Sequence, residues 1–274
     1  MSRRTHKQMF ALAGGCPDEV TVRGRIYRLV GVFKHDFFAA TALYAADDGA
    51  APERIVVKFG RRQGFCGLPL AWVGRYLARR ERRIHRRIDG IEGIQRWVDY
   101  VGPSAFALEY LPGRPLDTVD PPPGGAFFDA LRDLVDAVHE RGVAYGDLNK
   151  RSNILVTPDG RPALIDFQIC AFRPRRARWL RRIAADRIVA YLQRMDLYHL
   201  YKHKRRLAPE ALRRDERAMA QRRGGLLRLH RTVATPVRQV RRRLLTNLHR
   251  NGRLTSPTAC LEPGEQPEKA TWRR

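Results

Sequence analysis

The residues best suited to chemistry lie between positions 142 and 170, in the stretch GVAYGDLNKRSNILVTPDGRPALIDFQIC. Asp147 opens a polar loop, and Asn153 closes it just before a short apolar run. A Pro-Asp-Gly turn and a second apolar run follow, and the second run ends on Asp166. Two short strands joined by a turn form a β-hairpin. Such a hairpin would bring Asp147, Asn153 and Asp166 to one rim.

These side chains match the needs of phosphoryl transfer from ATP. That reaction requires a carboxylate to orient the attacking hydroxyl, and an amide and a second carboxylate to hold Mg²⁺ on the phosphates. Asp147 fits the first role, and Asn153 and Asp166 fit the second. Lys150 or Arg151, inside the loop, would neutralise the γ-phosphate. The alternative is an ordinary hairpin with solvated acids in its loops.

The same stretch resembles the catalytic and metal-binding loops of the protein-kinase superfamily. The patterns there are H-R-D-L-x-x-x-N and D-F-G, and this chain has Y-G-D-L-N-K-R-S-N and D-F-Q. Tyr145 and Gly146 replace the His and Arg, Gln168 replaces the Gly, and the loop is one residue longer. The Gly-Asp-Leu form is similar to atypical branches, namely lipopolysaccharide core-sugar (heptose/Kdo) kinases, RIO-type kinases, and aminoglycoside or choline kinases. The resemblance implies a kinase that uses ATP and Mg²⁺.

Upstream, the β-branched run 54–60 resembles the kinase strand that carries V-A-I-K. The resemblance implies that its lysine, Lys58, holds the α and β phosphates and needs an acidic partner. A helix predicted over 76–88 contains one acid before Asp89, Glu81, among many Arg. We therefore expect Glu81 to pair with Lys58, although Glu81 could instead offset local arginines on a solvated face.

A strand over 106–111 followed by Pro112-Gly113 resembles the hinge of a kinase. There, the backbone at Glu109 and Leu111 would meet the adenine edge. A helical repeat of Phe, Leu and Val predicts a helix over 126–141 that supports the catalytic loop.

Residues 27–38 take the position of the phosphate-covering loop but contain a single glycine. Glycines let backbone amides approach phosphates closely, so here Lys34 or His35 would supply charge instead. Residues 172–206 are predicted to form one or two basic helices. Within them, Asp196 resembles the acid of a buried helix that braces the catalytic loop from below.

These features predict an α+β protein with a two-lobed protein-kinase-like fold, in which a small antiparallel-sheet N-lobe precedes a short, mostly helical C-lobe. The expected boundaries are an N-terminal extension (1–24), the N-lobe (25–112), the C-lobe with the catalytic and metal-binding loops (113–210), and a basic tail (211–274). Within the tail, residues 225–253 alternate Leu or Val with Arg. They fit an amphipathic helix on an anionic membrane, a solvated helix or a disordered segment.

Composition limits the remaining function classes. The formal net charge is +25, and residues 171–274 hold 28 Lys and Arg against 8 Asp and Glu. The near-neutral remainder argues against a protein that only binds nucleic acid or membrane. The four cysteines form no C-x-x-C pair, which argues against zinc and for a reducing cytoplasm. We expect a cytoplasmic protein, peripheral at the inner face of the membrane.

Three functions remain open at this point. The first is an ATP·Mg²⁺ kinase whose acceptor is a sugar hydroxyl of a lipopolysaccharide-like glycolipid or a protein Ser/Thr. The second is an inactive pseudokinase scaffold, which the poor glycine loop, Gln168 and the lengthened catalytic loop suggest. The third is a basic membrane- or nucleic-acid-binding protein.

Overall fold

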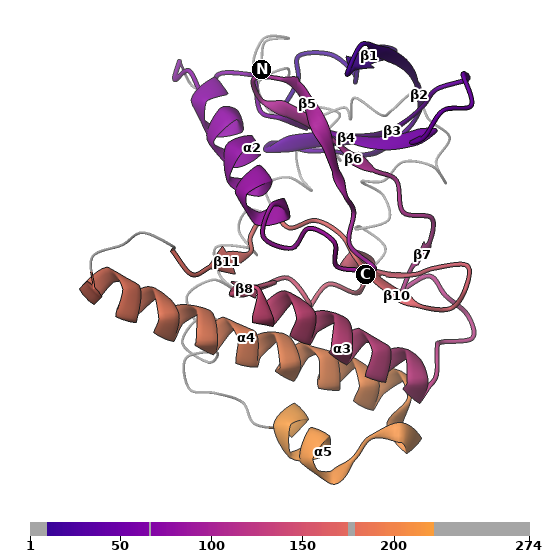
Figure 1. The fold of residues 1–274 in the computed structure, drawn as a ribbon, viewed down its shortest axis with the longest axis vertical. Coiled ribbons are helices and arrows are strands. Elements are labelled where there is room, and N and C mark those ends of the chain that lie inside the picture. The colour runs from indigo at the N-terminus through magenta and orange to yellow at the C-terminus, as the bar shows by residue number, and fades with distance from the viewer. Residues whose placement is uncertain (1–9, 66, 175–178, 222–274) are drawn as a thin grey trace, which may run out of the picture. The chain divides into compact units, whose positions relative to one another are not determined.

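The computed structural model describes residues 10–65, 67–174 and 179–221. The tail helix expected over 225–253 lies outside these residues. In the part of the chain so described, one six-stranded antiparallel sheet and four α-helices confirm the expected α+β class (Figure 1).

The chain divides into two compact units, which we describe separately. In the described part, the first contains residues 10–79 and 98–110, and the second contains 80–97 and 111–221. Helix α2 (Ala71–His85) therefore supplies residues to both. The sequence-based boundaries at 24/25 and 210/211 each fall inside a unit. The first boundary falls inside a unit because strand β1 pairs with β2 in the sheet, and the second because helix α5 packs on α4.

The first unit is built on the antiparallel sheet. Its spatial order is β1 (Glu19–Val22), β2 (Arg25–His35), β3 (Ala39–Ala45), β4 (Arg54–Gly60), β6 (Ala105–Glu109) and β5 (Trp97–Gly102). Strand β4 lies inside the sheet and its residues 55–59 are all buried. A β-branched run suits such a position, and β4 has the bounds predicted from the sequence.

Residues 10–16 also belong to the first unit, although the sequence suggested an extension. The Ala11 amide donates to the Asp36 carbonyl (2.8 Å), and the Ala11 carbonyl accepts from the Arg62 amide (2.9 Å). Leu12 and Cys16 pack into the hydrophobic core of the sheet. Burial raises the pKa of the Cys16 thiol to about 11. These contacts hold residues 10–16 on the sheet, so the first unit includes residues well before position 25, where the N-lobe was expected to start.

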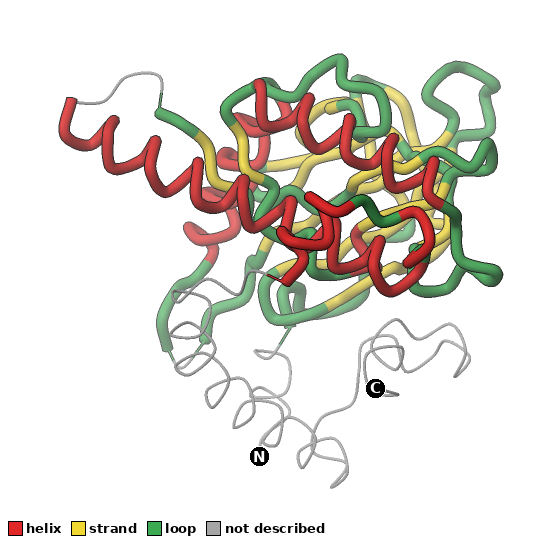
Figure 2. The backbone as a smooth tube through the Cα atoms, turned by 90° about the horizontal axis from the view of Figure 1, so that it is seen from below, coloured by secondary structure: helices red, strands yellow, loops and turns green. Residues whose placement is uncertain are grey.

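The second unit combines helices with short strands. They are β7 (Arg114–Pro115), α3 (Gly125–Glu140), β8 (Val143–Ala144), β9 (Ile154–Val156), β10 (Pro162–Leu164), β11 (Ala171–Phe172), α4 (Trp179–Leu207) and α5 (Arg214–Gln221). Helices α3 and α4 lie side by side (Figures 1 and 2). The core includes the α3 residues that the helical spacing identifies, namely Phe127, Leu131, Leu134, Val135 and Val138, and also Phe128.

Strands β9 and β10 pair antiparallel, which confirms the predicted hairpin around the Pro-Asp-Gly turn. Helix α4 is a single basic helix, while Phe172, expected at its start, lies with Ala171 in β11, which pairs with β8. Among the described helices, none has a stretch both long and apolar enough to cross a bilayer.

Candidate active site

The polar loop between β8 and β9 is the centre of the candidate site. It begins at the buried Tyr145, ends in a 3₁₀ turn at Arg151–Asn153, and carries Asp147 directly before the buried Leu148. Gly146, directly before Asp147, has φ +78°. Glycine adopts this left-handed conformation without steric cost. The turn therefore explains why Gly, and not the Arg of the kinase pattern, precedes the acid.

Asp196 of α4 supports this loop from below. It is fully buried, and its carboxylate accepts hydrogen bonds from the backbone amides of Tyr145 and Gly146, both at 2.8 Å. The His139 ring of α3 donates to the same carboxylate at 3.0 Å. A buried carboxylate that accepts three hydrogen bonds fixes the groups that donate to it. This confirms the brace expected for Asp196, and it makes His139 a packed residue of the loop's support.

Two further α4 side chains, which the sequence did not reveal, hold the same loop. The His203 ring donates to the Leu148 carbonyl (2.9 Å), and the Lys202 ammonium donates to the Asn149 side chain (3.2 Å). Burial lowers the pKa of His203 to about 4. Its imidazole is therefore neutral at physiological pH, and the bond to Leu148 fixes its Nε2 tautomer.

Asp147, Lys150 and Asn153 form one hydrogen-bonded set. Both Lys150 Nζ and Asn153 Nδ2 donate to Asp147 Oδ2, the latter at 2.9 Å. Because the Asn153 amide turns its nitrogen to Asp147, its oxygen faces away and can accept from another group or bind a cation. Lys150 therefore lies next to Asp147, and the role expected of it at the γ-phosphate stays a prediction.

Asp166 lies directly after β10, close enough for its charge to act on Asp147. Burial raises the pKa of Asp147, Lys150 opposes the rise, and the negative charge of Asp166 adds to it. The two strands are tied across the site, since the Ile165 amide donates to the Asn153 carbonyl (3.1 Å). The predicted rim of Asp147, Asn153 and Asp166 thus forms within the second unit.

Asp166 has φ +62°, in the left-handed region. Asp and Asn enter this region more readily than most residues, at some cost in energy. The segment after it is clamped by helix α2, because the Arg80 guanidinium donates to the carbonyls of Gln168 (2.5 Å) and Cys170. Phe167 packs edge-on against Tyr145, with ring centroids 5.0 Å apart. These contacts of Arg80 and Phe167 explain how the left-handed backbone at Asp166 is held. The role of Arg80 was not predicted from the sequence.

The predicted nucleotide-binding residues are divided between the units. Lys58 on β4 and Glu109 at the end of β6 belong to the first, whereas Glu81 on α2 and Leu111 belong to the second. In the sheet, Lys58 lies in register with Thr41 on β3. The Lys58–Glu81 pair and the adenine contacts stay predictions.

The turn between β2 and β3 corrects one expectation about the phosphate-covering loop. His35 is buried, and its Nε2 accepts a hydrogen bond from the Leu12 amide (3.2 Å). An accepting Nε2 carries no proton, so His35 does not supply the charge expected of it. Lys34 forms a salt bridge with Asp36 at 2.9 Å and remains exposed.

No family model matches this chain, and no curated protein matches it. Its function therefore has to be argued from the geometry of the loop.

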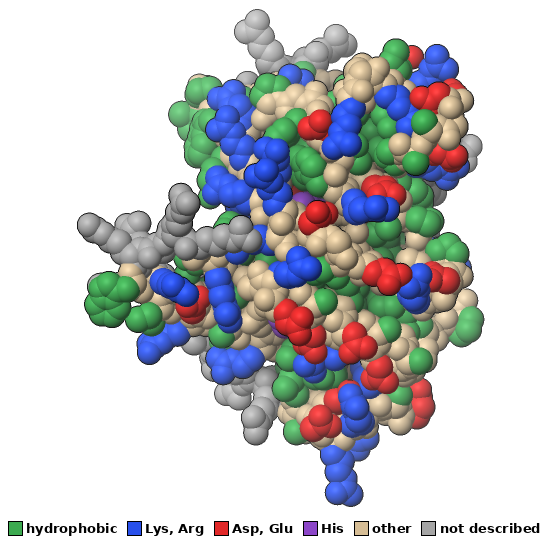
Figure 3. All heavy atoms as spheres, in the orientation of Figure 1, with side chains coloured by type: hydrophobic (Ala, Val, Ile, Leu, Met, Phe, Trp, Pro, Cys, Tyr) green, Lys and Arg blue, Asp and Glu red, His purple; other side chains and the backbone are tan. Residues whose placement is uncertain are grey.

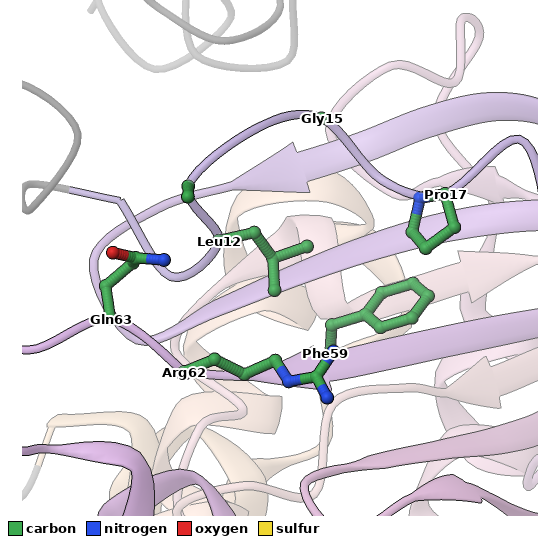
Figure 4. A pocket seen from close by; sticks show the side chains of 7 residues that line it. Leu12, Gly15, Pro17, Phe59, Arg62 and Gln63 are labelled. Carbon is green, nitrogen blue, oxygen red and sulfur yellow. The ribbon is translucent and has the colours of Figure 1, made fainter.

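A cavity of about 320 Å³ lies in the first unit, and Figure 4 shows its lining. It is formed by Leu12, Ala13, Gly15, Pro17, Phe59, Arg62 and Gln63. None of the predicted site residues lines it. The cavity is mainly apolar, and we assign it no part in the candidate chemistry.

Proposed function

We propose that this protein is a kinase that transfers the γ-phosphate of ATP to a hydroxyl acceptor. The observation that carries the proposal is the hydrogen-bonded set of Asp147, Lys150 and Asn153, with Asp166 close enough to perturb Asp147. Phosphoryl transfer depends on positioning and on neutralising charge. The site offers the Lys150 ammonium and the carboxylates of Asp147 and Asp166, and helix α4 fixes the loop that carries Asp147.

In this proposal Asp147 positions the acceptor hydroxyl and takes its proton. Its raised pKa suits a base, because a carboxylate with a higher pKa accepts a proton more readily. Lys150 holds Asp147 in place in the free protein and moves to the γ-phosphate as charge develops there. The exposed side chain of Lys150 allows such a movement.

Asn153 and Asp166 fit the needs of Mg²⁺. Among the described residues there is no group of three His, Cys, Asp or Glu side chains arranged for a metal. Mg²⁺ bound with phosphates needs only one or two protein oxygens, since water and phosphate supply the rest. The side-chain oxygen of Asn153, which does not face Asp147, and the Asp166 carboxylate meet that requirement. When bound, the metal would neutralise phosphate charge and orient the γ-phosphate.

The proposed architecture is a two-lobed kinase-like fold, in which the first unit is the N-lobe. Its element order supports this assignment, since three strands and the lysine strand β4 precede α2, and two more strands follow. In kinases the lysine strand and the next helix supply the phosphate-binding Lys and its Glu partner. Lys58 and Glu81 would take these roles, and the backbone of Glu109 and Leu111 would bind adenine.

The acceptor we favour is a sugar hydroxyl of a lipopolysaccharide-like glycolipid, with a protein Ser/Thr as the alternative within the same reaction. Gly146 removes the Arg that forms the pocket for a phosphorylated activation loop in regulated kinases. The short second unit and the basic C-terminal sequence also favour the glycolipid. Such a kinase would act in the cytoplasm, at the inner face of the membrane.

The test is thermal unfolding with ATP, with and without Mg²⁺, of wild type and Asp166→Asn. A ligand that binds the native state raises the melting temperature. Asn tolerates the left-handed backbone at this position, so the variant should fold. Asp159→Asn, in the exposed hairpin turn, is the matched control.

We expect a Mg²⁺-dependent stabilisation in wild type and Asp159→Asn, and none in Asp166→Asn. Asp147→Asn should keep the stabilisation but lose turnover. If wild type shows no stabilisation by ATP, the kinase proposal is wrong and the pseudokinase scaffold is favoured. If Asp147→Asn retains turnover, Asp147 is not the base.

A further inference from the structure

The first ten residues of α4, Trp179–Ile188, form an exposed segment that we call the α4 N-terminal segment. None of its described side chains is buried, and Val189 is the first residue of the helix whose side chain is described as buried. Apolar side chains nevertheless occur on it. Trp179 is 69% exposed, Ile188 57% and Ile183 45%. Three large apolar side chains exposed on so short a segment indicate a surface that meets a partner.

These side chains form two neighbouring rows on the helix. Trp179, Ile183 and Arg187 are spaced four residues apart, and Ala184 and Ile188 form the adjacent row with the same spacing. Residues four apart lie on the same face of an α-helix. All five are exposed, so the two rows make one continuous outward face with an arginine inside it.

The described part of this segment also carries positive charge, with Arg187 inside the outward face and Arg182 beside it. Arg182 and Arg187 are exposed. Asp186 is the only acid between Asp166 and Asp196, and it forms a salt bridge with Arg173 at 3.7 Å. The acid is therefore neutralised within the unit. Figure 3 shows hydrophobic atoms at this projecting end of the helix, with basic side chains around them.

We propose that the α4 N-terminal segment binds the surface of an anionic lipid bilayer. Helices that lie in a membrane interface place Trp and aliphatic side chains at the acyl boundary and Arg at the headgroups. Trp favours this depth because its ring is amphipathic. Arg187 lies between apolar residues, and its long side chain reaches the phosphates while its stem stays with the apolar groups.

Lipid explains this face better than another polyanion does. A nucleic acid would be bound by the arginines and by stacking on Trp179. It would gain little from Ile183 and Ile188, whose exposure costs free energy in water. The segment is also separate from the loop that carries Asp147. The inference therefore stands whether or not the protein is a kinase.

The experiment is co-sedimentation of the full-length protein with vesicles in the absence of nucleotide. One set of vesicles contains phosphatidylcholine alone, and the other also contains phosphatidylglycerol. The apolar variant is Trp179→Ser/Ile183→Ser/Ile188→Ser, which leaves the net charge unchanged. The matched control is Leu68→Ser/Trp72→Ser, which removes two equally exposed apolar side chains from the first unit. Arg182→Gln/Arg187→Gln tests the charge.

We expect wild type and the Leu68/Trp72 control to bind the anionic vesicles and to bind phosphatidylcholine weakly. The apolar variant should bind about tenfold more weakly, because three side chains lose their contact with the acyl boundary. The arginine variant should lose about fivefold per charge at low salt. All variants should keep the wild-type melting temperature, since every replaced side chain is exposed.

Equal binding of wild type and the apolar variant would overturn the proposal, because binding would then come from charge elsewhere in this basic chain. Tighter binding to a DNA duplex than to the vesicles, unchanged in the apolar variant, would overturn it in favour of nucleic acid. Absence of vesicle binding by wild type would overturn it as well.

Discussion

Replacing Asp196 by Asn tests whether α4 holds the loop that carries Asp147. The change keeps the shape of the side chain and turns one acceptor oxygen into a donor. Asp196 Oδ1 accepts from the Gly146 amide, and Oδ2 accepts from the Tyr145 amide and the His139 ring. If the Asn nitrogen takes the place of Oδ1, one donor loses its acceptor; if it takes the place of Oδ2, two donors do.

The cheaper orientation leaves only the Gly146 amide, which faces the buried side chain of residue 196, without an acceptor. An unsatisfied buried donor costs about 1–3 kcal/mol. The bonds that remain lose their ionic character, and charge-assisted bonds are roughly twice as strong as neutral ones. Together these terms predict a loss of about 2–4 kcal/mol in the free energy of unfolding. For a chain of this size the melting temperature should fall by about 5–15 °C.

The assay is urea unfolding followed by circular dichroism, with Asp186→Asn as the matched control on the same helix. Asp186 pairs with Arg173 at 3.7 Å, and both side chains are partly exposed. Such a pair contributes about 0–1 kcal/mol, so the control should unfold close to wild type. If Asp196→Asn is as stable as Asp186→Asn, the brace is not energetically important, and our account of the loop is wrong.

Three further replacements test other parts of the structure. Asp147→Asn should raise the melting temperature at neutral pH, because a raised pKa means that the ionised carboxylate destabilises the fold. The gain should vanish as the pH falls below the usual carboxyl pKa, and an equal loss at every pH would contradict this. Lys204→Met should lower the free energy of unfolding, measured with urea, by about 3 kcal/mol. The reason is that the buried Lys204 ammonium donates to the buried Glu216 carboxylate at 3.0 Å. Adding Glu216→Leu should recover part of the loss. Gly93→Ala should lower the melting temperature more than Gly160→Ala. Both glycines have positive φ, but of the two only Gly93 has a backbone carbonyl oxygen 2.8 Å from the position of an added Cβ. Equal effects would show that the backbone around Gly93 can shift.

The elements predicted from the sequence are those whose pattern and packing coincide. The run 54–60 is apolar and β-branched because β4 is buried inside the sheet. The helical repeat before residue 141 is visible because the same side chains of α3 form the core. In such cases one physical cause, burial, sets both the sequence pattern and the structure.

Helix α2 shows where that correspondence fails. We predicted residues 76–88, whereas the helix runs over Ala71–His85. Its first turns present Trp72 and Tyr76 to solvent, so the apolar repeat does not mark the buried face there. Gly74 resembles a helix breaker, yet a Cβ at this position would lie 2.3 Å from the Arg61 carbonyl oxygen. The glycine is needed for close packing, and only the structure shows this.

The sequence predicted the polar residues of the candidate site, but not most of the side chains that hold its backbone in place. Asp147, Asn153 and Asp166 stand in a recognisable spacing, whereas Asp196 was found only through a resemblance. Arg80 and His203 act on backbone carbonyls, which every residue possesses. A contact of that kind leaves no pattern in the sequence, and the surplus of arginine hides Arg80 further.

Helix α4 links the two proposals in one rigid element. Its middle holds the loop that carries Asp147 through Asp196, and its beginning carries the proposed lipid surface around Ile183. Thirteen residues separate these positions, which is about 20 Å along an α-helix. A bilayer bound at the α4 N-terminal segment would therefore lie within about 20 Å of the loop. A sugar hydroxyl of a glycolipid extends a comparable distance from its membrane. The two proposals together therefore predict that anionic vesicles increase the phosphorylation of an acceptor embedded in the membrane. The same vesicles should not increase the phosphorylation of a soluble fragment of that acceptor.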